Sequence, residues 1–130
     1  MTDCCYVQLE FRKSDLPILE KHLGKGFWDD EIKIGRKRME VGRSEANYGW
    51  YDPLHEAAKE GAVFIGWNAD GDNYGEGEFV SVEGEYHDFP TYEHRLVVPV
   101  NKNGEVSEKD LEAARAFLDR KKEALKVIRS

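Results

Sequence analysis

The chain has 130 residues, of which 40% are apolar and 35% are charged, a balance that is typical of one globular domain and excludes an intrinsically disordered chain. Its formal net charge is −7 at pH 7, and the charge is uneven, because residues 60–94 contain nine acidic side chains and no Lys or Arg. Such a segment repels nucleic-acid phosphates, which excludes direct contact between it and nucleic acid, and it suits a basic partner or a cation.

Alternating and helical spacings of apolar residues divide the chain into nine elements. The predicted elements are, in order, a strand at 4–11, a helix at about 15–23, strands at 31–35 and about 38–43, a helix at about 53–60, strands at 63–67, about 78–86 and 95–100, and a helix at about 108–128. Ser14, Asp52 and Ser107 are typical N-caps for the three helices. We predict a loop at 87–93, because Pro90 interrupts the pattern there.

The stretch at the centre of the prediction is 62–86, where an apolar run meets a cluster of Gly, Asp and Asn and is followed by alternation. The first strand of this stretch, Val63–Trp67, is apolar on both faces, which favours a central place in a sheet. The cluster of turn-forming residues after it predicts a hairpin.

The order β-α-β-β-α-β-β-β-α indicates a single α+β domain over residues 1–130. We expect a mostly antiparallel sheet of about five or six strands with the three helices on one face. A variant of the ferredoxin-like split β-α-β unit is one topology that fits this order.

The cysteines and the N-terminus predict a cytoplasmic protein. Cys4 and Cys5 are adjacent, so in a strand their side chains point to opposite faces and do not pair with each other. The N-terminus lacks the basic and apolar regions of a signal peptide, and no apolar run approaches the length of a membrane span. We therefore expect no membrane partner.

Motifs for catalysis or metal binding are weak. His87 and His94 flank one loop, but the chain has no HExxH or CxxC motif that would favour zinc. The stretch that begins at Asn68 has the oxygen spacing of a calcium loop, yet its sixth position is Asn73 and its twelfth is Phe79, where Gly and Glu are needed. We predict no catalytic residue, no metal and no cofactor.

The first functional hypothesis is a non-catalytic module that presents an acidic hairpin to a basic protein surface, such as a nucleic-acid-binding cleft. Carboxylates recur along the predicted strands and would form an array, with aromatic residues, Tyr86 among them, as anchors. The predicted partner-binding residues are Trp67, Asp70, Asp72, Tyr74, Glu76, Glu78, Glu83 and Glu85. In size and charge the chain resembles small inhibitors by which phages and plasmids block restriction or CRISPR machinery, although no motif assigns roles to its residues.

Two alternatives stay open. The first is a small-molecule-binding domain or enzyme with an aromatic pocket, in which His55 would be a base. The residues predicted for this pocket are Trp28, Asp29, Asp30, Tyr48, Trp50, Tyr51 and His55. The second is a structural subunit that forms a homodimer through the C-terminal helix, whose apolar face otherwise packs on the sheet.

Overall fold

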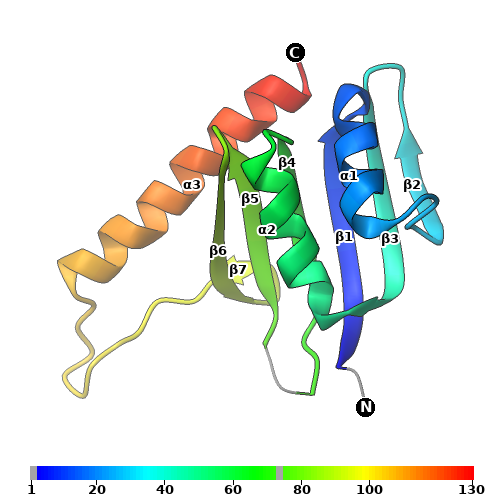
Figure 1. Ribbon diagram of the computed structural model, residues 1–130. Coiled ribbons are helices and arrows are strands. Elements are labelled where there is room, and N and C mark those ends of the chain that lie inside the picture. The colour runs from blue at the N-terminus through cyan, green and yellow to red at the C-terminus, as the bar shows by residue number, and fades with distance from the viewer. Residues whose placement is uncertain (1–2, 73–74) are drawn as a thin grey trace.

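The computed structural model describes residues 3–72 and 75–130 and is built on one seven-stranded antiparallel sheet (Figure 1). The strand order is β2-β3-β1-β4-β5-β6-β7. The elements are β1 (Cys4–Arg12), α1 (Leu16–Leu23), β2 (Asp30–Ile34), β3 (Arg38–Asn47), α2 (Tyr51–Lys59), β4 (Phe64–Asn68), β5 (Gly77–Val82), β6 (Glu85–Tyr92), β7 (Arg95–Leu96) and α3 (Glu108–Ile128). Short 3-10 turns at Lys13–Asp15 and Tyr48–Trp50 lead into α1 and α2. The predicted α+β class is confirmed, with more strands in the sheet than expected.

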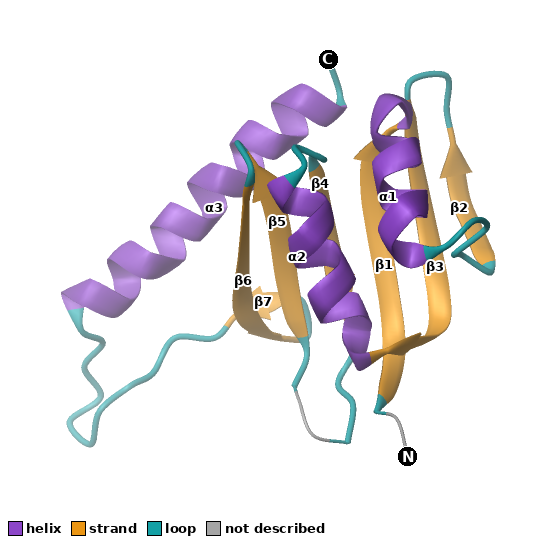
Figure 2. Cartoon of the chain, viewed as in Figure 1, coloured by secondary structure: helices purple, strands orange, loops and turns teal. Residues whose placement is uncertain are grey.

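The helices form two layers, one on each face of the sheet (Figure 2). α1 and α2 cover one face and contact each other, while α3 crosses the other face and contacts β4 and β5. The expectation that all helices share one face is therefore wrong. The reason is that the central strands are apolar on both sides: Phe64 and Phe79 belong to the core under α1 and α2, and Val80 belongs to the core under α3.

The first strand shows how alternation builds this arrangement. Val7, Leu9 and Phe11 are fully buried beneath α1 and α2, as the sequence predicts. Glu10 points to the opposite face and is also buried, because Arg38 and Arg129 both pair with its carboxylate. Arg129 follows the last turn of α3, so this charge cluster fastens the end of α3 to the sheet.

The predicted hairpin differs from the observed one. The predicted strand at 78–86 is interrupted by a turn at Glu83 and Gly84, whose φ angles of +55° and +78° are the left-handed values of two-residue hairpin turns. Residues after this turn form β6, which replaces the predicted loop at 87–93. The strand predicted at 95–100 is only the two residues of β7.

Every neighbouring pair of strands is antiparallel. Within this sheet β3 lies between β1 and β2, and β1 lies between β3 and β4, so β1-α1-β2-β3-α2-β4 has the strand order and pairing of the predicted ferredoxin-like split β-α-β unit. The strands β5, β6 and β7 and the helix α3 extend this unit. α3 buries its apolar face against the sheet through Ala114, Phe117, Ala124 and Ile128. Leu118 remains exposed, and self-association through this helix stays a prediction.

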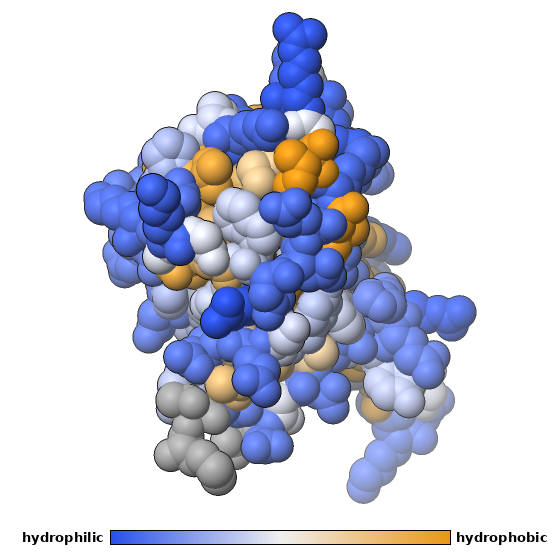
Figure 3. All heavy atoms as spheres, turned by 90° about the vertical axis from the view of Figure 1, so that its right-hand side faces the viewer, coloured by the Kyte–Doolittle hydropathy of each residue, from blue (hydrophilic) through white to orange (hydrophobic). Residues whose placement is uncertain are grey.

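The outer surface is largely polar. Seen from the β2 side, it is mainly hydrophilic and is interrupted by small apolar patches (Figure 3). β2 is the outermost strand on this side, and Ile32 and Ile34 are exposed on it. Within the described ranges, no helix combines the length and apolar character that a membrane crossing requires.

Candidate functional site

The acidic residues predicted to form one array are divided between the two ends of the sheet. β5 is six residues long, which corresponds to about 20 Å of strand. Glu83 and Glu85 lie at the end of β5 where it turns into β6, whereas Asp70 and Asp72 lie in the β4–β5 loop at the opposite end. The array therefore does not run along one hairpin, because the Glu83–Gly84 turn ends the strand that was expected to carry it.

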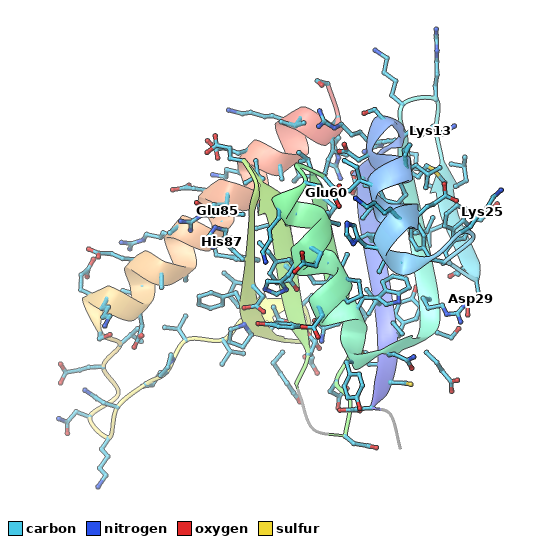
Figure 4. The ribbon with its side chains drawn as sticks, in the orientation of Figure 1. Lys13, Lys25, Asp29, Glu60, Glu85 and His87 are labelled. Atoms are coloured by element: carbon cyan, nitrogen blue, oxygen red, sulfur yellow. The ribbon has the colours of Figure 1, made fainter. Side chains whose placement is uncertain are left out.

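Two predicted partner-binding carboxylates are already paired with basic side chains within the chain. Lys121 of α3 donates to Glu78 at 2.6 Å, so Glu78 is neutralised by the helix rather than presented to a partner. Glu85 bonds His87 at 3.0 Å on β6, and Figure 4 shows these two side chains together at the α3 side of the sheet. Asp70, Asp72 and Glu83 are exposed.

Trp67 and Tyr74 were, together with Tyr86, the aromatic anchors of that hypothesis. Trp67 points to the α3 face, where its ring lies between the rings of Tyr6 and His94, with centroid distances of 6.1 and 4.6 Å. It is half-buried there and lies on the opposite face from α2. Tyr74 lies outside the described residues.

Glu76 carries a fixed negative charge at the loop end. Its carboxylate accepts hydrogen bonds from the Thr91 hydroxyl and from the backbone N–H groups of Glu93 and His94. These bonds, that of Thr91 above all, lower the pKa of Glu76 from its ordinary 4.5 to about 2. All three donors are neutral groups, so the carboxylate stays ionised without a cationic partner among them.

The residues predicted for an aromatic pocket are separated by the structure. Trp50 is only 8% exposed and packs edge-on against Phe27, and Trp28 packs against the same ring. Asp29 accepts the backbone N–H of Ser44, and Asp30 begins the outer strand β2. These residues belong to the α1 side of the molecule and do not meet the tyrosines.

Tyr48, Tyr51 and His55 do lie together, on the other side of the same segment. Tyr48 and Tyr51 are 56% and 51% exposed. The His55 ring lies between Tyr51 and Tyr86, at centroid distances of 4.2 and 3.8 Å, and its Nδ1 lies 2.7 Å from the Tyr51 carbonyl oxygen. His55 is thus held as part of an aromatic stack. Burial, together with the nearby Asp88 charge, raises the pKa of Tyr86 well above its ordinary value, so the phenol stays protonated.

A pocket of about 590 Å³ lies between the start of α2 and the adjoining ends of β4, β5 and β6. Its lining combines tyrosines with carboxylates, and none of its described residues is Lys, Arg or His. We name it the loop-end pocket, and it is lined by Tyr48, Gly49, Tyr51, Asp52, Asn68, Gly75, Glu76, Gly77, Tyr86, Asp88, Phe89 and Pro90. A concave aromatic wall with a few placed polar groups is the usual form of a binding site.

The backbone that supports this pocket is strained. Tyr48, Gly49 and Trp50 have consecutive φ angles of +51°, +61° and +59°, and residues other than Gly rarely adopt such values. The turn sends Trp50 into the core and leaves Tyr48 and Tyr51 at the surface. Strain of this kind is concentrated at functional sites, where it holds side chains in a set position.

Sequence reasoning missed two carboxylates of the pocket. Asp52 was interpreted as a helix cap, whereas it lies in the first turn of α2, whose N-cap residue is Trp50. Asp88 was placed in a loop, whereas it lies on β6. The signal for it was present as the alternation of Tyr86, Asp88 and Pro90, which share one face of that strand.

No family model, curated protein or solved structure matches this chain. Over residues 3–72 and 75–130, no group of three or more His, Cys, Asp or Glu side chains is arranged to hold a metal ion. The function is therefore argued from the loop end itself.

Proposed function

We propose that the protein is a non-catalytic binding module that docks the loop end of its sheet onto a basic protein surface. The observation that carries the proposal is a pocket lined by tyrosines and by the carboxylates of Asp52 and Asp88, without a described cation in its lining. Asp70 and Asp72 add exposed charge on the neighbouring loop. Charges of one sign on a rim steer an oppositely charged partner and select against partners of the same sign.

The exposed tyrosines support a protein partner. Tyr48 and Tyr51 are each about half exposed, and Tyr is among the residues that dominate the binding energy of interfaces. Because Asp52, Asp70, Asp72 and Asp88 gather at one end of the sheet, the proposed contact is local rather than extended along a strand. A nucleic-acid-binding cleft of another protein is a basic surface of this kind, and inhibition of such a protein is the finer form of the proposal.

A charge-neutralised variant tests this function. The variant carries Asp52→Asn, Asp70→Asn, Asp72→Asn and Asp88→Asn, and its probe is a synthetic peptide in which Arg and Lys alternate with Gly and Ser. Fluorescence anisotropy at low salt is expected to show binding by the native protein and a Kd raised about 10-fold or more in the variant. The affinity of the native protein should fall as salt screens the exposed charges.

The matched control removes the same number of charges elsewhere. It carries Glu83→Gln, Glu85→Gln, Glu112→Gln and Glu123→Gln, all at exposed positions away from the pocket. We expect its Kd to stay within about 3-fold of the native value, since distant rim charges contribute little. Equal losses in both variants would mean that only net charge matters and would contradict the proposed surface.

The pocket volume favours a second candidate, a small cationic molecule as ligand. About 590 Å³ lies within the range of small-molecule sites, which runs from about 300 to 1,000 Å³. Saturable binding of an organic ammonium compound, combined with no binding of basic peptides, would favour this candidate over the protein partner.

A further inference from the structure

The exposed tyrosines give the loop-end pocket flat aromatic faces. Tyr48 and Tyr51 are exposed beside it, and Tyr86 lies deeper, with its ring 6.1 Å from that of Tyr51. Tyr86 is itself stacked on Phe79 at 5.7 Å, which fixes it to the core. The face of an aromatic ring is electronegative and attracts a cation that lies over it.

Two carboxylates complete the pocket, and they come from different elements. Asp52 is in the first turn of α2 and Asp88 is on β6. Asp52 and Asp88 are exposed and make no salt bridge within the described part of the chain. Glu76 also lines the pocket, but its carboxylate is bonded on the Trp67 side, to Thr91 and His94. A cationic guest would supply the missing charge.

We propose that the loop-end pocket is a receptor for the guanidinium group of an arginine side chain, a conclusion that rests on the proposed function and names the residue by which the partner is held. A guanidinium is planar, stacks on aromatic faces and donates in fixed directions to carboxylates. An ammonium is a compact and strongly hydrated point charge, so it gains less from flat rings and spaced carboxylates. The pocket offers both of the features that a guanidinium uses.

The strained turn at 48–50 orders the side chains of this pocket before a ligand binds. The left-handed residues Tyr48, Gly49 and Trp50 bring the chain into α2, and Trp50 anchors the turn by packing on Phe27. Tyr48 and Tyr51 are therefore placed at the pocket before a ligand arrives. A site that is already ordered loses less conformational entropy on binding, which raises its affinity.

The test uses three blocked amino acids as probes: N-acetyl-arginine amide, the lysine equivalent, and the citrulline equivalent, which has the shape of arginine without its charge. Titration is followed by backbone amide NMR shifts of the full chain. We expect the arginine probe to bind with a millimolar Kd, as ligands of this size do, and to shift amides at 48–52 and 86–89. The lysine probe should bind about 3-fold more weakly, and the citrulline probe should bind at least about 10-fold more weakly.

A pair of tyrosine variants tests the aromatic wall. Tyr51→Leu removes a ring beside the pocket, while Tyr92→Leu removes a ring that is 70% exposed at the end of β6 and does not line it. Only Tyr51→Leu should weaken arginine binding, by about 5-fold. Equal binding of the citrulline and arginine probes, stronger binding of the lysine probe, or unchanged binding in Tyr51→Leu would overturn the inference.

The outcomes separate this inference from the proposed function. If the basic peptide binds and responds to the charge-neutralised variant while the arginine probe leaves the pocket unshifted, the receptor role fails and the docking surface stands. If neither the peptide nor the probe binds at the loop end, both proposals fail.

Discussion

Glu76 shows how a single residue can hold charge without a counter-ion. Its bonds to Thr91, Glu93 and His94 satisfy the carboxylate with neutral groups, so the ionised form is favoured and its negative charge is retained. Glu78, two residues further on, differs, because a salt bridge with Lys121 neutralises its charge. Neighbouring acidic residues in one sequence can therefore differ completely in what they offer a partner.

The lowered pKa of Glu76 predicts a change of stability in acid. The folded pKa of about 2 lies below the ordinary 4.5, so the contribution of Glu76 is fully present above about pH 4.5 and is lost as the pH falls toward 2. We expect Glu76→Gln to be less stable than the native protein at pH 7, with a flatter dependence of unfolding free energy on pH between 4.5 and 2. Urea denaturation at a series of pH values measures this.

Glu83, in the β5–β6 turn, provides the control for the urea denaturation of Glu76→Gln. Glu83→Gln should reproduce the native pH profile, because Glu83 is exposed in the β5–β6 turn. If Glu76→Gln follows the native profile as closely as Glu83→Gln does, the carboxylate is not held as described.

Gly66 on β4 is a residue at which no side chain fits. A Cβ there would lie 2.2 Å from the Phe79 ring and 2.6 Å from the Gln8 carbonyl oxygen. We expect Gly66→Ala to lower the unfolding free energy by about 3 kcal/mol, as overpacking of a filled core does. Gly75→Ala is the control, since its Cβ would meet nothing within 4 Å, and a loss as large as that of Gly66→Ala would contradict the packing.

At the scale of elements, the sequence predicts well those helices and strands whose apolar residues recur at a regular spacing. α3 was predicted at about 108–128 and lies at Glu108–Ile128, because its capping residue Ser107 and its apolar spacing are both local signals. β4 was correctly predicted as a central strand from its apolar run. The β5–β6 turn was not predicted, because two-residue hairpin turns favour Asn or Asp before Gly, whereas here Glu83 precedes the glycine.

The loop at 87–93 was wrongly predicted because of Pro90. A proline lacks the N–H that a strand ladder uses, which is why it indicated a loop. Pro90 is tolerated because β6 lies next to the edge of the sheet, and its carbonyl still accepts the N–H of Val97 at 2.9 Å. The assignment mattered for the site, since Asp88 lies on the strand that was missed.

The fastening of α3 to the sheet can be tested through Arg129. Its Nε and Nη2 atoms each donate to the Glu10 carboxylate at 3.0 Å. We expect Arg129→Gln to lower the unfolding free energy by about 1–2 kcal/mol and to speed amide hydrogen exchange in the last turn of α3.

Lys126→Gln provides the comparison for that prediction, because Lys126 is exposed near the same helix end. It should change stability by no more than about 0.5 kcal/mol. If the two variants are equally destabilised, the effect comes from positive charge at the C-terminus of the helix rather than from the pair with Glu10.

At the scale of the molecule, charge and shape divide the surface into functional regions. The labelled cations Lys13 and Lys25 lie over the α1–β2 side, away from β6 (Figure 4). The loop end carries the carboxylates and the tyrosines, and the described residues of its pocket include no cation. This separation gives a basic partner one preferred direction of approach.

The sequence predicted that this surface is negatively charged, but not which side chains form it. The segment 60–94 was identified from its lack of Lys and Arg, and that information is local. Which carboxylates are engaged depends on partners far along the chain, as with Glu78 and Lys121, and spacing cannot reveal those contacts. The aromatic run at 48–51 was found, yet its division between core and pocket follows from the left-handed turn, which no residue other than Gly49 indicates.

The most direct test of the central claim is to map where a basic partner binds. Backbone amide shifts of the full chain, recorded during titration with the Arg- and Lys-containing peptide, report the contact residue by residue. We expect the largest shifts at 48–52, 68–72, 75–77 and 86–89, around the loop-end pocket. Shifts centred instead on the Glu83–Gly84 turn, on α3 or on the α1–β2 side would contradict the account.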